Sequence, residues 1–417
     1  MTPVAPTPWY RAATAAQWKT LLAAQLGWML DAMDVMLYAF ALGTIQKEFN
    51  LSGAGAGALA SVTLVTSAAG GIFFGWLADR IGRTRALIYS ILVYSVCTAL
   101  TATSRGIAEL VLWRSLVGIG LGGEWSAGSV LVSETWPAAH RGKAIGLMQS
   151  GWAVGYIAAA LLAAAILSVW GWRVLFAVGV LPALLTLWIR RHVPEPEVWR
   201  AAAPAGARDP RLGGALGEMF RPPLRRPTLV AVLMTTCVLF AYWGLFTWLP
   251  AFLAAPMEKG GAGLGIVKSS GWIVPMQIGA FFGYTLFGFL ADRIGRRPVF
   301  VGFLVAAAAL VPVYGQLARH ELALLALGPF IGFFGHGYFS VFGAMLAELF
   351  PTRIRGTAQG MVYNAGRAVS ALAPFTIGAL ADAHGIGGAL ALTAAFFLAG
   401  AALMALLPET RGRELAE

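Results

Sequence analysis

The chain has 417 residues, of which 58% are hydrophobic and only 12% are charged, whereas a soluble domain is roughly 45–50% apolar and about 25% charged. With a mean hydropathy of +0.72, this composition excludes a disordered chain, a coiled coil and an ordinary soluble enzyme. The net charge of +11 fits either a nucleic-acid-binding protein or a membrane protein, so the placement of the charges decides between them.

Twelve apolar runs, broken by charges and turn residues, follow one another along the chain. A helix needs ~20 apolar residues to cross about 30 Å of hydrocarbon. Backbone groups in a bilayer must pair internally, and these runs lack the alternation of barrel strands, so we predict an all-α membrane protein with twelve transmembrane helices. The predicted helices are Thr20–Ile45, Gly57–Ala78, Ala86–Thr103, Ile107–Val132, Lys143–Ser168, Arg173–Arg191, Thr228–Ala254, Val267–Ala291, Val299–Ala318, Glu321–Leu346, Thr357–Ala381 and Gly387–Leu407.

A polar stretch separates the sixth predicted helix from the seventh. It is rich in Pro, Gly, Ala and Arg, a composition that we interpret as a tether. We therefore predict an N-terminal six-helix half over residues 1–191, a cytoplasmic linker over 192–227 and a C-terminal six-helix half over 228–417.

The distribution of Lys and Arg predicts the orientation. With the N-terminus placed in the cytoplasm, 22 of the 30 basic residues fall in inside segments and 6 in outside segments, while Arg114 and Arg367 lie within predicted helices. Cytoplasmic loops of membrane proteins carry such an excess. We interpret the positive charge as a topology signal with both termini in the cytoplasm, and we expect no nucleic-acid partner.

Three motifs occur twice, 213 or 214 residues apart. The copies are GWLADRIGR at Gly75–Arg83 and GFLADRIGR at Gly288–Arg296, the pattern E-x-x-P-x-x-x-R-G at Glu134–Gly142 and Glu348–Gly356, and Pro-Glu at Pro194-Glu195 and Pro408-Glu409. The chain is therefore predicted to consist of two halves with the same orientation. Transporters built from such repeats rock their halves around a site near the membrane midplane.

The pattern Gly-x-x-x-Asp-Arg-x-Gly-Arg, between the second and third predicted helices of each half, resembles the signature loop of the major facilitator superfamily. The resemblance covers nearly the whole chain. It implies that the chain is a transporter working by alternating access and is not an enzyme. The sequence contains no P-loop or nucleophile elbow, so we expect an ion gradient to drive transport.

Three further segments, Leu30–Asp34, Arg114–Trp125 and Tyr363–Arg367, resemble the metabolite:proton symporters of this superfamily. The nearest branch carries sialate and short monocarboxylates such as lactate and pyruvate. The aromatic-acid symporters come next, through the paired aspartates of the first helix. The seventh helix reads TTCVLFAYW over Thr235–Trp243 and departs from the His- and Gln-containing pattern of the fungal monocarboxylate carriers.

Three acidic residues lie well inside predicted membrane helices, where an ionised side chain costs ~2.5–3.5 kcal/mol. Asp31 and Asp34 share one helix face, and two carboxylates in a poorly hydrated cavity do not both ionise easily at neutral pH. Glu124 follows a row of glycines that we expect to serve close helix packing. We predict that Asp31, Asp34 and Glu124 couple protons to transport; the alternatives are a structural role for one aspartate and a pair of Glu124 with Arg114 or Arg367.

Arg367, in the eleventh predicted helix, is the predicted substrate ligand, because a guanidinium can hold a carboxylate through two parallel hydrogen bonds. Asn364 shares its helix face and can add a donor or acceptor. The alternative for Arg367 is a charge pair with Asp34 or Glu124 that locks the halves until substrate breaks it. Arg114 is predicted to be a structural or coupling partner of an aspartate in the first helix.

Amide and aromatic side chains are predicted to form the rest of the cavity wall. Gln149, Trp152 and Tyr156 share one face of the fifth helix, and Tyr242, Trp243 and Trp248 lie in the seventh; packing or interface anchoring is the alternative role. His336, in the tenth helix, is either a satisfied interior imidazole or a proton relay. The sequence contains no metal-ligand cluster, and we expect no cofactor other than the proton gradient.

Charged residues of the repeated loops are predicted to form a gate at the cytoplasmic edge of the membrane. They are Asp79, Arg80, Arg83, Glu134 and Arg141 in the first half and Asp292, Arg293, Arg296, Glu348 and Arg355 in the second. Each contact is worth little when solvated, but a network can shift a two-state equilibrium by a few kcal/mol. Simple positive-inside anchoring does not explain the acidic residues in both copies.

We therefore expect a multi-pass protein of the bacterial inner membrane that imports a small organic acid together with protons as a monomer. Its N-terminus lacks the apolar core and cleavage site of a removable signal peptide. The main alternative is a proton-driven multidrug exporter in which the same acids carry the proton and the aromatic residues line a broad pocket. A receptor is disfavoured because we expect no sizeable soluble domain.

Overall fold

The computed structural model describes residues 10, 13–51, 53–201, 212–254 and 256–411, and the secondary structure among these residues is helical throughout. The linker residues 202–211 and the ends of the chain lie outside the described residues. The α-helices are α2 (Ala15–Glu48), α3 (Gly53–Ile81), α4 (Arg83–Thr101), α5 (Ile107–Thr135), α6 (Ala138–Leu162), α7 (Ser168–Val178), α8 (Pro182–His192), α9 (Glu197–Ala201), α10 (Leu212–Met219), α11 (Arg225–Ala254), α12 (Gly265–Ile294), α13 (Arg296–Gln316), α14 (Glu321–Gly337), α15 (Phe339–Leu349), α16 (Arg355–Ser370), α17 (Leu372–Leu390) and α18 (Leu392–Ala405).

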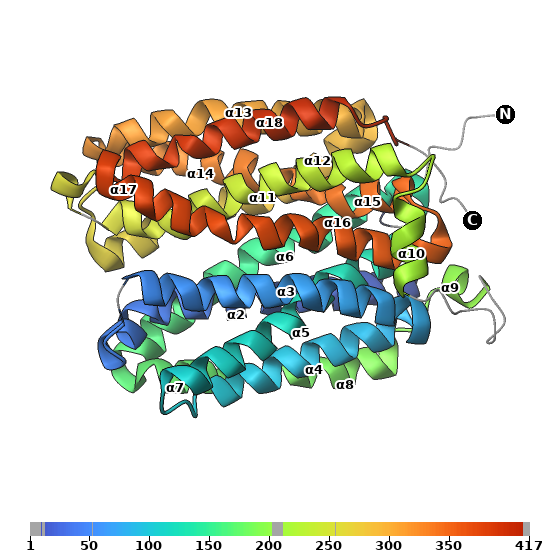
Figure 1. The fold of residues 1–417 in the computed structure, drawn as a ribbon, viewed down its shortest axis with the longest axis horizontal. Helices are drawn as coiled ribbons and strands as arrows, with labels where there is room; N and C mark the ends of the chain where they lie inside the picture. Colours follow the sequence, from blue (N-terminus) through green and yellow to red (C-terminus); the bar gives the residue numbers. More distant parts are fainter. Residues whose placement is uncertain (1–9, 11–12, 52, 202–211, 255, 412–417) are drawn as a thin grey trace.

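The helices form two bundles that lie side by side (Figure 1). Helices α2 to α8 form the N-bundle and α11 to α18 the C-bundle. The bundles meet mainly where α6 packs on α12 and where α16 packs on α3. The end of the molecule at which α9 and α10 lie is called the linker end below.

Local sequence explains where several helices begin and end. Thr14 and Gln17 form a capping box at the start of α2, each side chain accepting a hydrogen bond from the other's backbone N–H. Gly82 and Gly295 separate α3 from α4 and α12 from α13 at φ angles of 117° and 130°, which residues with a Cβ rarely adopt. The last glycine of the repeated GxLADRIGR motif is therefore the turn that reverses the chain.

Several of the predicted helices are divided in the structure. The sixth consists of α7 and α8, the tenth of α14 and α15, and the eleventh of α16 and α17. Pro182 opens α8 and Pro374 lies in the first turn of α17, and proline fits a first helical turn because its missing N–H has no intrahelical partner there. The described parts of the predicted tether also form helices α9 and α10.

Among the described residues, ten helical segments are long and apolar enough to cross a membrane. They do not include α5 or α16, two of the twelve predicted spans. These two helices carry the buried charges Arg114, Glu124 and Arg367, while Asp31 and Asp34 lie in α2, which is among the ten. Exposed Leu161, Leu184 and Phe375 are examples of the many large apolar side chains on the outer surface, as expected of a surface that faces lipid.

The glycine row of α5 serves packing, as predicted. A Cβ on Gly122 would lie 1.8 Å from the carbonyl oxygen of Ser67, and one on Gly120 would lie 2.5 Å from the backbone nitrogen of Tyr94. Because any side chain would collide with backbone atoms there, α5 lies in close contact with both α3 and α4. This close packing fixes Glu124 in position behind α2.

Candidate functional site

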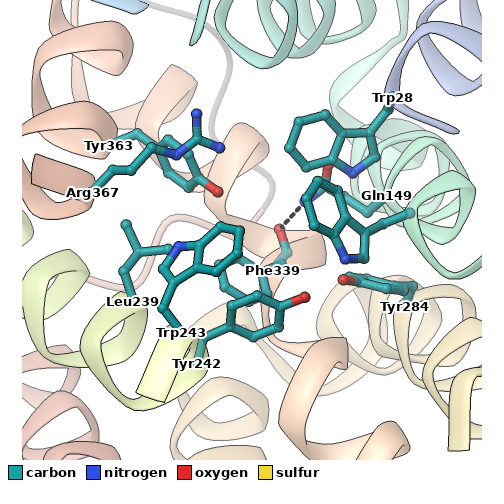
Figure 2. Close-up of a pocket in the computed structure, with 10 residues that line it drawn as sticks. Trp28, Gln149, Leu239, Tyr242, Trp243, Tyr284, Phe339, Tyr363 and Arg367 are labelled. Atoms are coloured by element: carbon teal, nitrogen blue, oxygen red, sulfur yellow. Dashed lines mark hydrogen bonds between the residues drawn. The ribbon is translucent and has the colours of Figure 1, made fainter. Parts of the chain in front are cut away.

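A small cavity lies between the bundles, and aromatic side chains dominate its wall (Figure 2). Its lining comes from α2, α6, α11, α12, α15 and α16, in the residues Trp28, Gln149, Trp152, Leu239, Tyr242, Trp243, Tyr284, Phe339, Tyr363 and Arg367. The free volume among them is about 10 Å³, which is room for about one water molecule. A substrate therefore enters only if these side chains move apart.

The rings of this wall form a continuous chain across both bundles. The ring centroids of Trp28 and Trp152 lie 4.8 Å apart, those of Trp152 and Trp243 6.3 Å, and those of Tyr242 and Phe339 5.0 Å. Gln149 of α6 donates a hydrogen bond of 3.3 Å to the carbonyl oxygen of Phe339, the contact drawn in Figure 2. The cavity is thus closed by contacts between residues of opposite bundles.

Arg367 is the cation in this wall. Its side chain is only 4% exposed, its Nη1 donates to Ser67 Oγ at 3.3 Å, and its guanidinium carbon lies 5.1 Å from the ring centroid of Tyr363. Among the described residues no carboxylate lies within ion-pair distance of it, and its Nε has no hydrogen-bond partner. Burying a guanidinium without a paired carboxylate costs free energy, and an anion that binds next to it would offset that cost.

Asp31 and Glu124 lie close enough to Arg367 to interact with it electrostatically, and they interact with each other as well. Both side chains are fully buried. Glu124 Oε1 lies against Gly27 of α2, where an added Cβ would come within 2.4 Å of it, one helical turn before Asp31. Neither oxygen of Glu124 has a hydrogen-bond partner among the described residues.

Asp34 has a different environment from Asp31. Its Oδ2 lies 3.7 Å from Nη1 of Arg114, and the guanidinium of Arg114 stacks over the ring of Tyr38 at 4.7 Å. The predicted partnership of Arg114 with an aspartate of the first helix is therefore present in the structure. Of the three acids predicted to couple protons, Asp34 is the one with a cation at ion-pair distance.

The cavity wall does not include Asp31, Asp34, Glu124 or Arg114, and further predicted site residues also lie away from it. Asn364 donates to the carbonyl of Gly360 in its own helix and packs against Gly71 of α3, where an added Cβ would lie 1.9 Å from its Nδ2. Tyr156 packs its ring on Phe40. His336 is buried among Tyr242, Phe246 and Tyr284. Its Nδ1 donates to the carbonyl of Gly332 at 3.1 Å, but its Nε2 has no hydrogen-bond partner among the described residues, so only one of the two ring nitrogens is satisfied.

The predicted gate residues form two equivalent clusters at the linker end, one in each bundle. In the N-bundle, Arg83 donates two hydrogen bonds to Glu134, at 3.1 and 3.0 Å, and one of 2.8 Å to Asp79. In the C-bundle, Arg296 donates two to Glu348, at 3.0 and 2.9 Å, and one of 3.0 Å to Asp292. The sequence repeat is thus a structural repeat.

Contacts between the bundles join these two clusters. Arg355 of the C-bundle lies 3.5 Å from Glu134, and Arg141 of the N-bundle donates to Glu348 at 3.3 Å. Asp79 Oδ2 accepts hydrogen bonds of 2.9 Å from both the backbone N–H and the hydroxyl of Thr357. The linker end is therefore closed in this structure.

Small residues of the repeated motifs make this closure possible. An added Cβ on Gly75 would come within 2.9 Å of the carbonyl of Gly356, and one on Gly288 within 2.5 Å of the carbonyl of Gly142. The first glycine of each GxLADRIGR copy thus packs against the glycine that ends the other repeated motif in the opposite bundle. Arg80 and Arg293 are exposed and lie outside the network of described residues, because they point away from the interface that Asp79 faces.

The repeated Pro-Glu motif, to which no role was given from sequence, brings a carboxylate to each motif loop. Glu195 accepts hydrogen bonds from the backbone N–H groups of Thr84 and Arg85. Glu409 does the same for Arg296 and Arg297. Burial alone would raise the pKa of Glu409, but a backbone hydrogen bond from the N–H of Arg411, together with those from Arg296 and Arg297, holds it below its ordinary value. The repeat offset in the sequence was the signal that could have identified this pair.

We expect Glu348→Gln to open the linker end. The change removes the carboxylate that Arg141 and Arg296 share, which leaves Arg296 with Asp292 alone. A loss of about 2 kcal/mol of closure would change the ratio of closed to open molecules about 30-fold. The test is the distance between spin labels at exposed Arg85 and Arg297, on α4 and α13, in a chain whose two cysteines are replaced by serine.

The matched control is Glu321→Gln, which removes an ion pair with Lys268 inside the C-bundle at the opposite end. It should leave the distance distribution unchanged. An unchanged distribution in Glu348→Gln as well would contradict a gating role for the network.

Comparisons with known proteins agree with this geometry. The family model described as Major Facilitator Superfamily matches residues 26–274 and 264–416. A Haemophilus influenzae protein, named as a candidate metabolite transport protein, is 37% identical over 404 residues, covering 95% of this chain and 98% of its own. The cis,cis-muconate transport protein of Acinetobacter baylyi is 35% identical over 390 residues and covers 92% of each chain. A solved proton:xylose symporter matches with a TM-score of 0.79 at 20% identity, covering 96% of this chain and 98% of its own, a likeness that concerns the fold alone.

Proposed function

We propose that this chain, which belongs to the major facilitator superfamily, carries a small organic anion across the membrane together with protons. Membership in that superfamily makes it a multi-pass membrane transporter rather than an enzyme. The observation that carries the finer proposal is Arg367, a buried cation in the wall of the central cavity with no described carboxylate at ion-pair distance. A substrate carboxylate is the group that would complete its hydrogen bonds.

The rings around Arg367 favour a planar or compact carboxylate. Trp28, Trp152 and Trp243 offer apolar faces and edges, which pack well against flat groups. Monocarboxylates such as lactate and pyruvate, aromatic acids, sialate and unsaturated acids such as cis,cis-muconate are the candidates. The name of the Acinetobacter baylyi relative supports the last of these.

Asp31 and Glu124 are the proposed proton carriers, with Asp34 held to Arg114. These two acids lie behind the lining of the empty cavity, and they and Arg367 influence one another electrostatically. When protons neutralise the acids, Arg367 is left as the uncompensated charge and attracts the substrate carboxylate. The loaded cavity then has little net charge, which lowers the cost of reorienting it through the closed state.

The gate network gives this cycle its two states. In the state described here the linker end is closed by Glu134, Glu348 and Asp79. Rocking of the bundles would separate these contacts and release the substrate at that end. The excess of Lys and Arg in the linker-end loops supports placing this end in the cytoplasm, so that transport would be inward across the bacterial inner membrane.

The test is uptake into proteoliposomes that contain the purified full chain. Radiolabelled lactate, pyruvate, benzoate, cis,cis-muconate and sialate are supplied with and without an imposed pH gradient, acidic outside. For one proton carried with each monovalent anion, we expect about tenfold accumulation per pH unit for at least one acid. If an acid gradient stimulates the uptake of none of these compounds relative to empty liposomes, the proposal fails.

A proton-driven multidrug exporter remains the second candidate, because the cavity wall is mostly aromatic. Such a cavity can accept many flat apolar compounds, and Asp31 and Glu124 could carry the protons. Arg367 distinguishes the two functions, since a buried guanidinium repels lipophilic cations. Cells that express the chain should therefore gain no resistance to ethidium; strong resistance that depends on Glu124 would favour the exporter.

A further inference from the structure

A second hollow lies at the linker end, at the start of α11, and it shares no lining residue with the central cavity. Its lining is formed by Pro222, Pro223, Arg225, Arg226, Leu229 and Val230, and its volume is about 470 Å³. Arg221 lies next to it, so three arginines fall within six residues. We call this site the arginine hollow.

The arginines of the hollow carry positive charge that the described residues do not balance. Arg221, Arg225 and Arg226 are exposed, and none has an ion pair with a described residue. The nearest described acid in the sequence, Glu218, is bound by Arg353 instead. The site is thus suited to an anion that comes from outside the chain.

An apolar strip continues from the charged end of the hollow along α11. Arg225, Leu229 and Leu233 are spaced four residues apart and therefore share one helix face. Leu229 is 43% exposed and Leu233 is 55% exposed. One face of the helix thus presents a cation followed by two apolar side chains, in the order in which a lipid presents its headgroup and its acyl chain.

The backbone around the hollow is held in place. The N–H of Arg225 donates to the carbonyl of Arg221 at 3.0 Å, and the hydroxyl of Thr228 donates to the carbonyl of Met219 at 3.0 Å. These bonds join the end of α10 to the start of α11. The arginines are therefore presented at a fixed turn, which lowers the entropy lost when they bind a ligand.

We propose that the arginine hollow binds the headgroup of an anionic phospholipid, with one acyl chain lying along Leu229 and Leu233. A guanidinium can hold two phosphate oxygens at once, and a basic pocket at a membrane surface is suited to such headgroups. A free phosphate ion would also satisfy the arginines, but it would make no contact with Leu229 and Leu233. Contact with this apolar strip therefore distinguishes a phospholipid from free phosphate. The inference does not depend on the substrate of the central cavity.

The experiment measures lipid retained by the purified full chain in detergent, by native mass spectrometry. Phosphatidylglycerol and phosphatidylcholine with identical acyl chains are supplied together. We expect the wild-type chain to retain phosphatidylglycerol in preference, and the variant Arg221→Gln/Arg225→Gln/Arg226→Gln to lose that preference by about tenfold or more. The single variant Arg225→Gln should show a smaller loss, which keeps the test valid if the triple variant folds poorly.

The control removes the same charge elsewhere at the linker end. Arg190→Gln/Arg191→Gln/Arg297→Gln changes three exposed arginines on α8 and α13 and should keep the preference. Equal losses in both triple variants would mean a general surface potential and would overturn the proposal, as would an unchanged preference in the hollow variants. Displacement of the lipid by inorganic phosphate at equal concentration would show a free-anion site and would also overturn it.

Discussion

Arg367→Lys should lower proton-driven uptake of the transported acid about 100-fold. Lysine keeps the charge but cannot form two parallel hydrogen bonds to a carboxylate, and the loss of a buried charge-assisted contact is worth about 2–3 kcal/mol. Because the charge is retained, the electrostatic effect on Asp31 and Glu124 is largely preserved. The measurement is the initial rate of uptake into proteoliposomes under the same pH gradient, with the amount of inserted protein determined for each variant.

The matched control is Arg319→Lys, an exposed arginine at the end opposite the linker. Its uptake should stay within about twofold of the wild-type rate, because surface charge pairs contribute little. A second readout is the rise in melting temperature that substrate causes, which Arg367→Lys should abolish and Arg319→Lys should keep. Wild-type rates and substrate stabilisation in Arg367→Lys would refute the anion-binding role.

The repeat in the sequence predicted the fold, and the comparisons confirm the predicted family. The two copies of GxLADRIGR predicted that the two halves have equivalent folds. The structure also explains why the motif has glycine at both of these positions. Gly82 supplies a backbone conformation with positive φ, while Gly75 permits contact with Gly356 across the interface. The charged clusters at the linker end were predictable for the same reason, because both copies of the repeat carry the acids and the arginines; their gating role stays a prediction.

The composition of the central cavity was only partly predictable. Gln149, Trp152, Tyr242, Trp243 and Arg367 were expected in its wall and line it, whereas Trp248 was expected there and does not line it. The lining residues that were missed are Trp28, Leu239, Tyr284, Phe339 and Tyr363. They are apolar or aromatic residues within apolar helices, so periodicity alone does not separate a cavity-facing ring from a packed one.

For Asn364 the error is the opposite one, because it was predicted in the cavity wall but lies outside it. It is polar, and it lies one turn from Arg367, yet it faces α3 rather than the cavity. Helical spacing gives the angle between two side chains but does not say which neighbouring helix each one meets. That depends on Gly71, which leaves room for the amide, and no pattern within the eleventh predicted helix contains this information.

Glu124→Gln should separate proton coupling from substrate binding. Glutamine has nearly the same shape and fills the space beside Gly27, but it cannot release or accept the coupled proton. We expect stimulation of uptake by the pH gradient to fall at least tenfold, while exchange of labelled for unlabelled substrate without a gradient continues. The same substitution at Glu109, an exposed residue of the same helix that accepts a hydrogen bond from the N–H of Arg105, should leave both activities unchanged.

The comparison of exchange with net uptake is what makes this test specific. If Glu124 only supported packing, its replacement would lower both activities together, because a distorted α5 would disturb the whole cavity. If Asp31 alone carried the proton, Glu124→Gln would keep gradient-driven uptake and Asp31→Asn would lose it. Asp34→Asn differs from both, since it leaves Arg114 without its carboxylate and should lower the melting temperature before it affects coupling.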